Sequence, residues 1–299
     1  LLPRQGGPGM TPTTEPGAAA APALKMFDLG GRVAMVTGTA QGLGRAMALA
    51  LAEAGADLVL LDLNEAGNEA TAEQARALGR RALAIAGDVT DFGHIDHVFE
   101  RIDREFGRID FLGNVAGNAR MAPAATMSLQ DVNYTFHNLV ISRFYTCQQA
   151  GRRMLAQGRG SIVSIGSIAG DRSLGRDQTV YGMAMAAVIH MTKELSTEWA
   201  GRGVRVNCIL PAQVVGDNGL GPRMQADPYL ADTFLRGIPR GRFGRPDDIR
   251  GLSVLLASDA ADWITGACIP MDGGNLGMNA GGGLLAPIIR KHLQSTQEG

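Results

Sequence analysis

The sequence predicts one doubly wound α/β domain, in which a parallel sheet carries helices on both faces. Two observations predict it. Short apolar runs rich in β-branched residues alternate with longer amphipathic stretches from Phe27 onward. Runs that are apolar at nearly every position are typical of strands covered on both faces, as parallel strands are. The helical stretches between them suit the crossovers that parallel strands require.

The strands and helices alternate in order along the chain. The short apolar runs predict strands at residues 32–38, 56–63, 81–88, 109–117, 160–170, 204–210 and 267–271. The stretches with apolar residues at helical spacing predict helices at 42–55, 65–79, 91–107, 128–157, 178–201 and 246–258. Repeated strand–helix alternation of this kind predicts a Rossmann-like sheet.

We divide the chain into three segments. Residues 1–26 are rich in Pro, Gly, Ala and Thr and are predicted to form a disordered tail. Residues 27–275 hold the Rossmann-fold domain, and residues 276–299 form a C-terminal extension. Within that extension, the apolar stretch 281–294 is expected either to dock on a neighbouring subunit or to fray.

Two stretches are candidates for the substrate end. Residues 212–245 are expected to form a lid over the active site, as mobile segments commonly do; the alternative is a pair of surface helices that pack their own apolar faces. The loop 118–123 should face the same pocket. Their mixed apolar and polar side chains suit sugars, polyols, hydroxy-ketones and steroids alike.

Composition excludes several functional classes. The chain has 28 basic and 29 acidic residues and a net charge of −1, which gives no reason to expect nucleic acid or an anionic membrane as partner. No apolar run reaches the length of about 18 residues that a membrane span needs. The cysteines Cys147, Cys208 and Cys268 lack the spacing of a disulfide framework or a metal site, which predicts a cytoplasmic protein without a metal.

A glycine-rich turn predicts a dinucleotide site. The first predicted strand ends in TGTAQGLG, whose Gly38, Gly42 and Gly44 allow a tight turn and let backbone N–H groups approach a pyrophosphate. Asp62 follows 18 residues later, at the end of the second strand. Its carboxylate can bind the adenine ribose 2′-hydroxyl and repel a 2′-phosphate; alternatively it is a turn residue. No Lys or Arg lies between Gly38 and Gly44, which favours NAD over NADP.

Short motifs then follow one another in a fixed order: TGTAQGLG, GDVT (87–90), GNVAG (113–117), SIVSIGS (161–167), Tyr181, GRGVRVNCILPA (201–212) and MDGG (271–274). Together they resemble the classical short-chain dehydrogenase/reductase family, over about residues 27–275. The resemblance implies an NAD-dependent oxidoreductase that interconverts a secondary alcohol and a ketone. It also implies a homotetramer or homodimer, in which long helices from the middle of the chain pack across a two-fold axis.

The resemblance also implies which residues bind the dinucleotide. Asp88 contacts adenine, while Asn114, Ala116 and Gly117 border the adenosine and the central sheet. The full implied set is Gly38, Gln41, Gly42, Leu43, Gly44, Asp62, Asp88, Val89, Asn114, Ala116, Gly117, Tyr181 and Pro211. Two positions depart from the family: Val115 replaces a frequent asparagine, and Ala212 replaces a frequent glycine.

Proton transfer at an alcohol needs a hydroxyl beside the substrate oxygen. The resemblance implies Tyr181 as the acid/base and Ser167 as the hydrogen-bonding partner of that oxygen. It implies Asn138 as the asparagine that supports a water, placed by its 24-residue distance from Asn114; Asn133 is a poorer candidate. The helix after Asn138 is one residue longer than in the family, which leaves open the register in which Asn138 matches the family's asparagine. Taken singly, Ser167 could be a strand-end hydroxyl and Asn138 an ordinary polar helix residue.

The remaining active-site position departs from the family. Met185 stands four residues after Tyr181, where the family has a lysine that holds the nicotinamide ribose and favours the tyrosinate. Residues i and i+4 of a helix are neighbours, but a thioether neither donates a hydrogen bond nor carries charge. A unit charge at about 4 Å contributes about 4 kcal/mol at an effective dielectric near 20. We therefore expect impaired turnover, with alcohol oxidation affected more than ketone reduction.

Other basic residues are poor substitutes for that lysine. Lys193 lies 12 residues beyond Tyr181, which is about 18 Å along a helix. Arg172 and Arg176 lie in the loop after Ser167 and either meet an anionic substrate or are solvated. Two alternatives to an impaired dehydrogenase therefore stay open. One is an inactive dinucleotide-binding relative with a regulatory role, and the other is a non-redox enzyme on the same fold.

Overall fold

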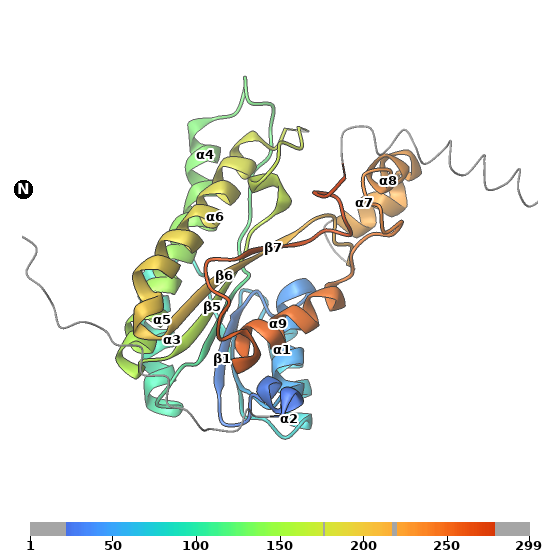
Figure 1. Cartoon of the computed structure of the whole chain (residues 1–299). Helices are drawn as coiled ribbons and strands as arrows, with labels where there is room; N and C mark the ends of the chain where they lie inside the picture. Colours follow the sequence, from blue (N-terminus) through green and yellow to red (C-terminus); the bar gives the residue numbers. More distant parts are fainter. Residues whose placement is uncertain (1–21, 176, 217–219, 279–299) are drawn as a thin grey trace, which may run out of the picture.

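A seven-stranded parallel sheet runs through the centre of the protein. The computed structural model describes residues 22–175, 177–216 and 220–278. The strand order is β3-β2-β1-β4-β5-β6-β7 (Figure 1). The strands are β1 Val33–Thr37, β2 Asp57–Asp62, β3 Ala82–Ala86, β4 Phe111–Asn114, β5 Gly160–Ile165, β6 Val204–Pro211 and β7 Cys268–Met271. The predicted doubly wound fold is confirmed, and the strand order reverses between β1 and β4.

Helices cover both faces of this sheet (Figure 1). One face carries α1 Gly42–Glu53, α2 Glu65–Ala77 and α9 Arg250–Ala257. The other carries α3 Phe92–Glu105, α5 Ser142–Gln157 and α6 Thr179–Trp199. The predicted helix at 246–258 begins as a 3₁₀ turn, Pro246–Ile249, before α9.

Two apolar cores hold these layers together. Every residue of β1 is buried, and its side chains alternate between the two cores. On one side α3 contributes Ile95, Phe99 and Ile102, which recur at helical spacing and are fully buried. Each such side chain contributes about 1.5–3 kcal/mol of hydrophobic stabilisation. The packing fixes the carboxyl ends of β1, β2, β4 and β5 relative to one another, and functional groups gather at this edge.

The long helix predicted at 128–157 is interrupted. It comprises α4 Leu129–Phe136, a π-helical turn His137–Ile141, and then α5. In the π-turn the Ser142 N–H donates to the His137 carbonyl, five residues back. A π-turn accommodates one extra residue without rotating the helix that follows. The additional residue that the family resemblance implies would therefore be absorbed within this single turn.

The predicted lid segment forms two short helices beyond the sheet. They are α7 Leu220–Ala226 and α8 Pro228–Leu235, and they stand apart from α4 and α6 (Figure 1). Tyr229 of α8 is 82% exposed. At the amino terminus, Ala23–Phe27 form a 3₁₀ helix. The rest of the predicted tail, and the stretch 281–294 with its two alternatives, lie outside the described residues.

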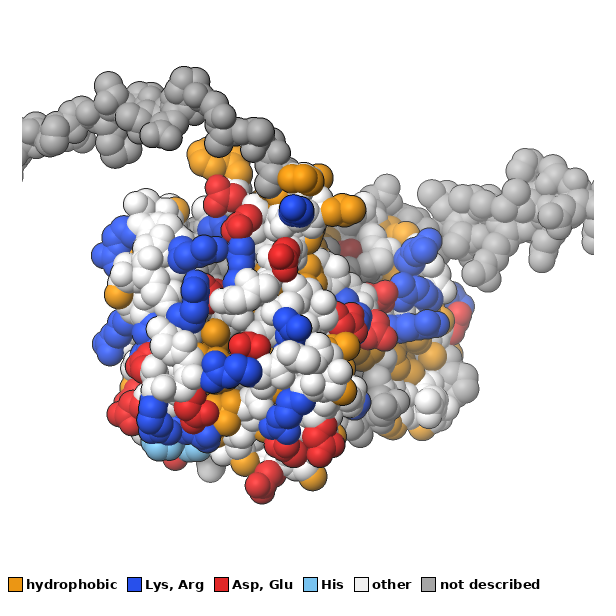
Figure 2. All heavy atoms as spheres, turned by 90° about the horizontal axis from the view of Figure 1, so that it is seen from below, with side chains coloured by type: hydrophobic (Ala, Val, Ile, Leu, Met, Phe, Trp, Pro, Cys, Tyr) orange, Lys and Arg blue, Asp and Glu red, His pale blue; other side chains and the backbone are white. Residues whose placement is uncertain are grey.

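The described surface mixes charges of both signs. Figure 2 shows basic and acidic side chains interspersed on the face seen from below. No helix among the described residues has the length and apolar character needed to cross a membrane. In the same part of the chain, no group of three His, Cys, Asp or Glu side chains is placed to hold a metal ion.

Candidate active site

The glycine-rich turn between β1 and α1 is shaped by its glycines. Gly38 and Gly42 have φ values of +75° and +59°, which L side chains rarely adopt. At Gly44 the constraint is space, because a Cβ there would lie 2.0 Å from the Gly38 carbonyl oxygen. The first turn of α1 can therefore approach β1 closely only with glycine at position 44.

A cavity of about 620 Å³ lies beside this turn, at the carboxyl edge of the sheet. The predicted dinucleotide residues that line it are Gly38, Gln41, Gly42, Leu43, Gly44, Asp62, Asp88, Val89, Ala116 and Gly117. Three of them open α1, where backbone N–H groups have no intrahelical partner. The positive end of a helix and a glycine cradle suit a pyrophosphate, so these residues fit a dinucleotide.

Asp62 fulfils the turn role and also borders the cavity. Its Oδ2 accepts the Ala40 N–H at 2.9 Å, and its Oδ1 accepts the Asn64 N–H at 2.8 Å. These bonds tie the glycine-rich turn to the end of β2. Each carboxylate oxygen can accept a second hydrogen bond, and Asp62 is only half-buried. The carboxylate therefore keeps capacity for a ribose hydroxyl.

Three predicted dinucleotide residues do not line this cavity: Asn114, Tyr181 and Pro211. Asn114 is buried, and its Nδ2 donates to the Arg143 carbonyl at 3.0 Å. It joins the end of β4 to α5. Pro211 ends β6, where it pairs with Met271 of β7.

Ser167 follows β5 and is 7% exposed. Its Oγ accepts the Ala169 N–H at 3.1 Å and so caps the turn Ile168–Gly170. Ser167 therefore does act as a strand-end hydroxyl, the alternative considered for it, through this one bond. As an acceptor in this bond, the hydroxyl retains its hydrogen for donation to another oxygen.

Tyr181 lies in the first turn of α6, next to the turn that Ser167 caps. A Cβ on Gly182 would lie 3.0 Å from the Ala169 carbonyl oxygen, so the two segments are in close contact. The half-buried Tyr181 ring packs on an apolar cluster that includes Leu139 and Ile168. The end of β5 and the first turn of α6 are therefore held as one unit.

Met185 is buried in that same cluster, with 1% of its surface exposed. Met185 lies one turn after Tyr181 on α6. Its backbone packs closely against Gly170, since a Cβ added to Gly170 would lie 2.6 Å from the Met185 carbonyl carbon. The methionine therefore occupies an apolar space that is closed to water.

Asn138 and Asn133 point to different cavities. Asn138, in the π-turn, lines the cavity beside the glycine-rich turn, and its Nδ2 donates to the Tyr134 carbonyl at 3.2 Å. Asn133 is exposed and lines a separate hollow with Phe136 and Met183. The position of Asn138 favours it over Asn133 as the residue near the reaction centre.

Comparison with known proteins identifies the family. The sequence model of the family described as enoyl-(acyl carrier protein) reductase matches residues 38–275. D-threitol dehydrogenase from Mycolicibacterium smegmatis is 43% identical over 83% of this chain and 94% of its own length. The chain belongs to the short-chain dehydrogenase/reductase family of oxidoreductases. Another relative, 2-dehydro-3-deoxy-D-gluconate 5-dehydrogenase from Escherichia coli, is 36% identical over 84% of this chain and 98% of its own.

Solved structures of this family share the fold. Xylitol dehydrogenase bound to NAD⁺ has a TM-score of 0.77 and 29% identity, covering 82% of this chain and 99% of its own. A structure from Beutenbergia cavernae with NADP at low occupancy has a TM-score of 0.79 and 35% identity, covering 84% and 99%. Nicotinamide dinucleotides of both kinds therefore bind members of this family.

Two of the basic residues considered as substitutes for the family lysine, Lys193 and Arg172, are exposed. Lys193 lies on α6. Arg172 is exposed and pairs with Asp171, Nη1 to Oδ2, at 3.2 Å. Arg176 lies outside the described residues. Solvation, one of the two alternatives for Arg172, agrees with this position.

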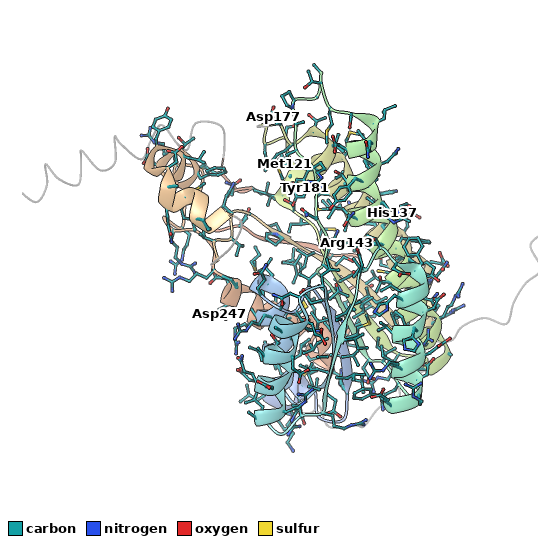
Figure 3. The ribbon with its side chains drawn as sticks, turned by 180° about the vertical axis from the view of Figure 1, so that it is seen from behind. Met121, His137, Arg143, Asp177, Tyr181 and Asp247 are labelled. Atoms are coloured by element: carbon teal, nitrogen blue, oxygen red, sulfur yellow. The ribbon has the colours of Figure 1, made fainter. Side chains whose placement is uncertain are left out.

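Arg143 belongs to none of the sequence motifs and is 3% exposed at the start of α5 (Figure 3). Its Nη1 donates to the Leu139 carbonyl at 2.9 Å and its Nη2 to the Val115 carbonyl at 3.2 Å. The feature of the sequence that could have indicated Arg143 is an arginine five residues after Asn138, within a helix predicted to pack on the sheet.

The loop 118–123 contributes Asn118 to the cavity beside the glycine-rich turn. Arg120 places its guanidinium 4.7 Å from the centre of the Tyr134 ring, and Met121 is half exposed (Figure 3). The loop thus borders the cavity with one polar side chain and covers α4 with another.

Proposed function

We propose that the protein is an NAD(H)-dependent dehydrogenase that interconverts a secondary alcohol of a small polyol and the corresponding ketone. The proposal rests on the close contact between the Ser167 turn and the first turn of α6, together with the cavity of about 620 Å³ at the carboxyl edge of the same sheet. The names of two relatives, a threitol and a xylitol dehydrogenase, support polyols as the substrate class.

The proposed roles follow from the chemistry of the side chains. A nicotinamide dinucleotide held in the cavity by the glycine-rich turn and Asp62 would provide the hydride chemistry of this reaction. Ser167 donates its remaining hydrogen to the substrate oxygen, while its own oxygen stays fixed by the Ala169 N–H. Tyr181 removes the hydroxyl proton during oxidation and returns it during reduction. Asn138 holds a water at the cavity wall. The impairment expected from Met185 belongs to this proposal as a prediction.

Replacing Asp62 by asparagine tests the preference for NAD. We expect Asp62→Asn to lower the ratio of kcat/KM for NAD⁺ to that for NADP⁺ by about 10- to 100-fold, since hydrogen bonds to charged groups contribute about 1.5–3 kcal/mol. Steady-state rates with both dinucleotides measure the ratio. Glu65→Gln is a matched control, because Glu65 is exposed nearby and does not line the cavity. An unchanged ratio in Asp62→Asn would contradict the role of this carboxylate.

The proposed activity is tested directly by following NADH absorbance with NAD⁺ and a panel of four- and five-carbon polyols, each beside its ketone with NADH. We expect oxidation of at least one polyol and faster reduction of its ketone. Dinucleotide binding without any turnover would favour the inactive regulatory relative. Turnover of a substrate with no change in NADH would favour the non-redox enzyme. Failure to bind either dinucleotide would refute the assignment of the cavity.

Self-association is part of the same proposal. Ile141, Phe144 and Met183 are exposed apolar side chains on the helices from the middle of the chain. Exposed apolar patches commonly mark protein interfaces. We propose that α4, α5 and α6 pair across a two-fold axis in a homodimer or homotetramer, in a cytoplasmic protein. Both statements stay predictions.

A further inference from the structure

Arg143 is a buried cation for which the described part of the chain provides no acidic partner. Its two recorded hydrogen bonds go to backbone carbonyls, those of Leu139 and Val115, and its Nε has no partner within the described structure. Among the described residues it forms no ion pair with Asp or Glu. Burying an uncompensated charge is costly, so a buried arginine normally has an anion nearby. A group that can carry negative charge is therefore expected near Arg143.

The π-turn places this cation behind the wall of the dinucleotide cavity. Asn138 and Arg143 are five residues apart, a spacing that puts them about 140° apart in an α-helix. The π-turn, with its bond between residues five apart, returns them to one face. Both meet Gly117, where a Cβ would lie 3.1 Å from Arg143 Nη1 and 3.2 Å from the Asn138 carbonyl oxygen. Because Gly117 lines the cavity, the guanidinium lies directly beneath it.

Three titratable groups lie close enough to the guanidinium to affect its pKa: Tyr181 of α6, Cys208 of β6 and Cys147 of α5. Burial lowers the pKa of Arg143, and negative charge on any of the three acts to raise it. Burial also raises the pKa of the Cys147 thiol to about 11. A hydrogen bond with Cys268, together with burial, raises the pKa of Cys208. Both thiols therefore stay neutral at physiological pH, and arginine stays charged.

Tyr181 is the remaining acid of these three groups. Figure 3 places Tyr181 and Arg143 at the same end of the sheet. The Leu139 carbonyl, which accepts from Arg143, belongs to a residue of the apolar cluster on which Tyr181 packs. Met185 belongs to that cluster too, and its neutral side chain spares the site a second buried cation. Two like charges at short range in an apolar cluster would repel each other strongly.

We propose that Arg143 supplies the positive charge that stabilises the phenolate of Tyr181, in the role for which this family uses a lysine at the place of Met185. The inference rests on the proposed function, and it changes the expected consequence of Met185. The cation approaches the tyrosine from α5 rather than from α6. Alcohol oxidation then does not depend on a lysine in α6.

The test is a spectroscopic titration of one phenol, which needs no substrate. The chain has 4 tyrosines, so each protein is compared with its own Tyr181→Phe counterpart, and the difference in phenolate absorbance against pH reports Tyr181 alone. We expect the midpoint in the unmodified protein to lie below that in Arg143→Met, because a nearby opposite charge favours the phenolate. Arg152→Met, an exposed arginine on the same helix, should leave the midpoint unchanged.

A second variant tests whether a cation at position 185 can replace the one at position 143. The double variant Arg143→Met/Met185→Lys places the cation where the family has it, and we expect it to restore a low midpoint. Arg143→Lys should retain most of the effect. If Arg143→Met fails to fold by circular dichroism, Arg143→Gln, which still donates to the Leu139 carbonyl, takes its place. Equal midpoints in the unmodified protein and the neutral variant would overturn the inference.

Failure of this inference and failure of the proposed function give different results. The pH-rate profile for polyol oxidation should move upward in Arg143→Met by the same amount as the phenol midpoint. Turnover with an unmoved midpoint and profile would refute the role of Arg143 and leave the function in place. A displaced midpoint in a protein that oxidises no polyol would refute the function and leave the charge assignment in place.

Discussion

The variant Tyr181→Phe is expected to lose about 100- to 10,000-fold in kcat, which is the usual contribution of a positioned general acid or base. The ring can keep its place in the apolar cluster with Leu139 and Ile168, so only the hydroxyl is removed. Dinucleotide affinity should not change, because Tyr181 does not line the cavity beside the glycine-rich turn. Steady-state kinetics and NADH fluorescence titration measure the two quantities separately.

The matched control for this variant is Tyr145→Phe. The Tyr145 hydroxyl donates to Asp96 at 2.7 Å on the outside of α5, away from the cavity. This variant should keep full activity. Retention of activity in Tyr181→Phe would mean that the proton is transferred by another group, and Ser167 would become the first candidate.

Gly44→Ala is expected to have the largest effect on cofactor binding. The added Cβ would lie 2.0 Å from the Gly38 carbonyl oxygen, so α1 must move away from β1. Overpacking of this kind lowers the free energy of unfolding by about 1–3 kcal/mol. The shift also displaces the N–H groups that would hold the pyrophosphate, so NADH affinity should fall with stability. Denaturant unfolding and NADH titration measure the two effects.

Gly251→Ala is the control with the same substitution. Gly251 also lies early in a helix, α9, but a Cβ there meets nothing within 4 Å. This variant should gain about 0.5–1 kcal/mol of stability, since alanine favours helix more than glycine does. If the two variants behaved alike, the close approach of α1 to β1 would not be the reason for glycine at position 44.

The sheet could be predicted from the sequence because its signal is local. Each strand is a short apolar run, and the parallel order follows from the helices between them, as the uninterrupted burial of β1 illustrates. The glycine-rich turn could be predicted for the same reason. Gly38, Gly42 and Gly44 lie within seven residues, and the same turn between β1 and α1 requires all three.

The surroundings of Tyr181 could be predicted only in part. Met185 was identified because it lies four residues away on the same helix, a relation that sequence spacing fixes. Arg143 lies 38 residues before Tyr181 on another helix. Its approach depends on how α5 and α6 pack and on the π-turn, and neither is readable from spacing. The double role of Asp62 is a similar case, because its bond to Ala40 joins two segments of the chain.

The π-turn also has a consequence for the alignment of related chains. An added residue inside a helix would normally turn every later side chain by about 100°. Here the change ends at Ile141, so Cys147, Ala150 and Met154 remain buried against the sheet. A gap at the π-turn, between α4 and α5, is therefore the correct alignment with chains that lack the extra residue. A search for the usual lysine alone would classify a chain with methionine in its place as inactive. A search that also detects the extra residue in the helix would examine the residue at position 143.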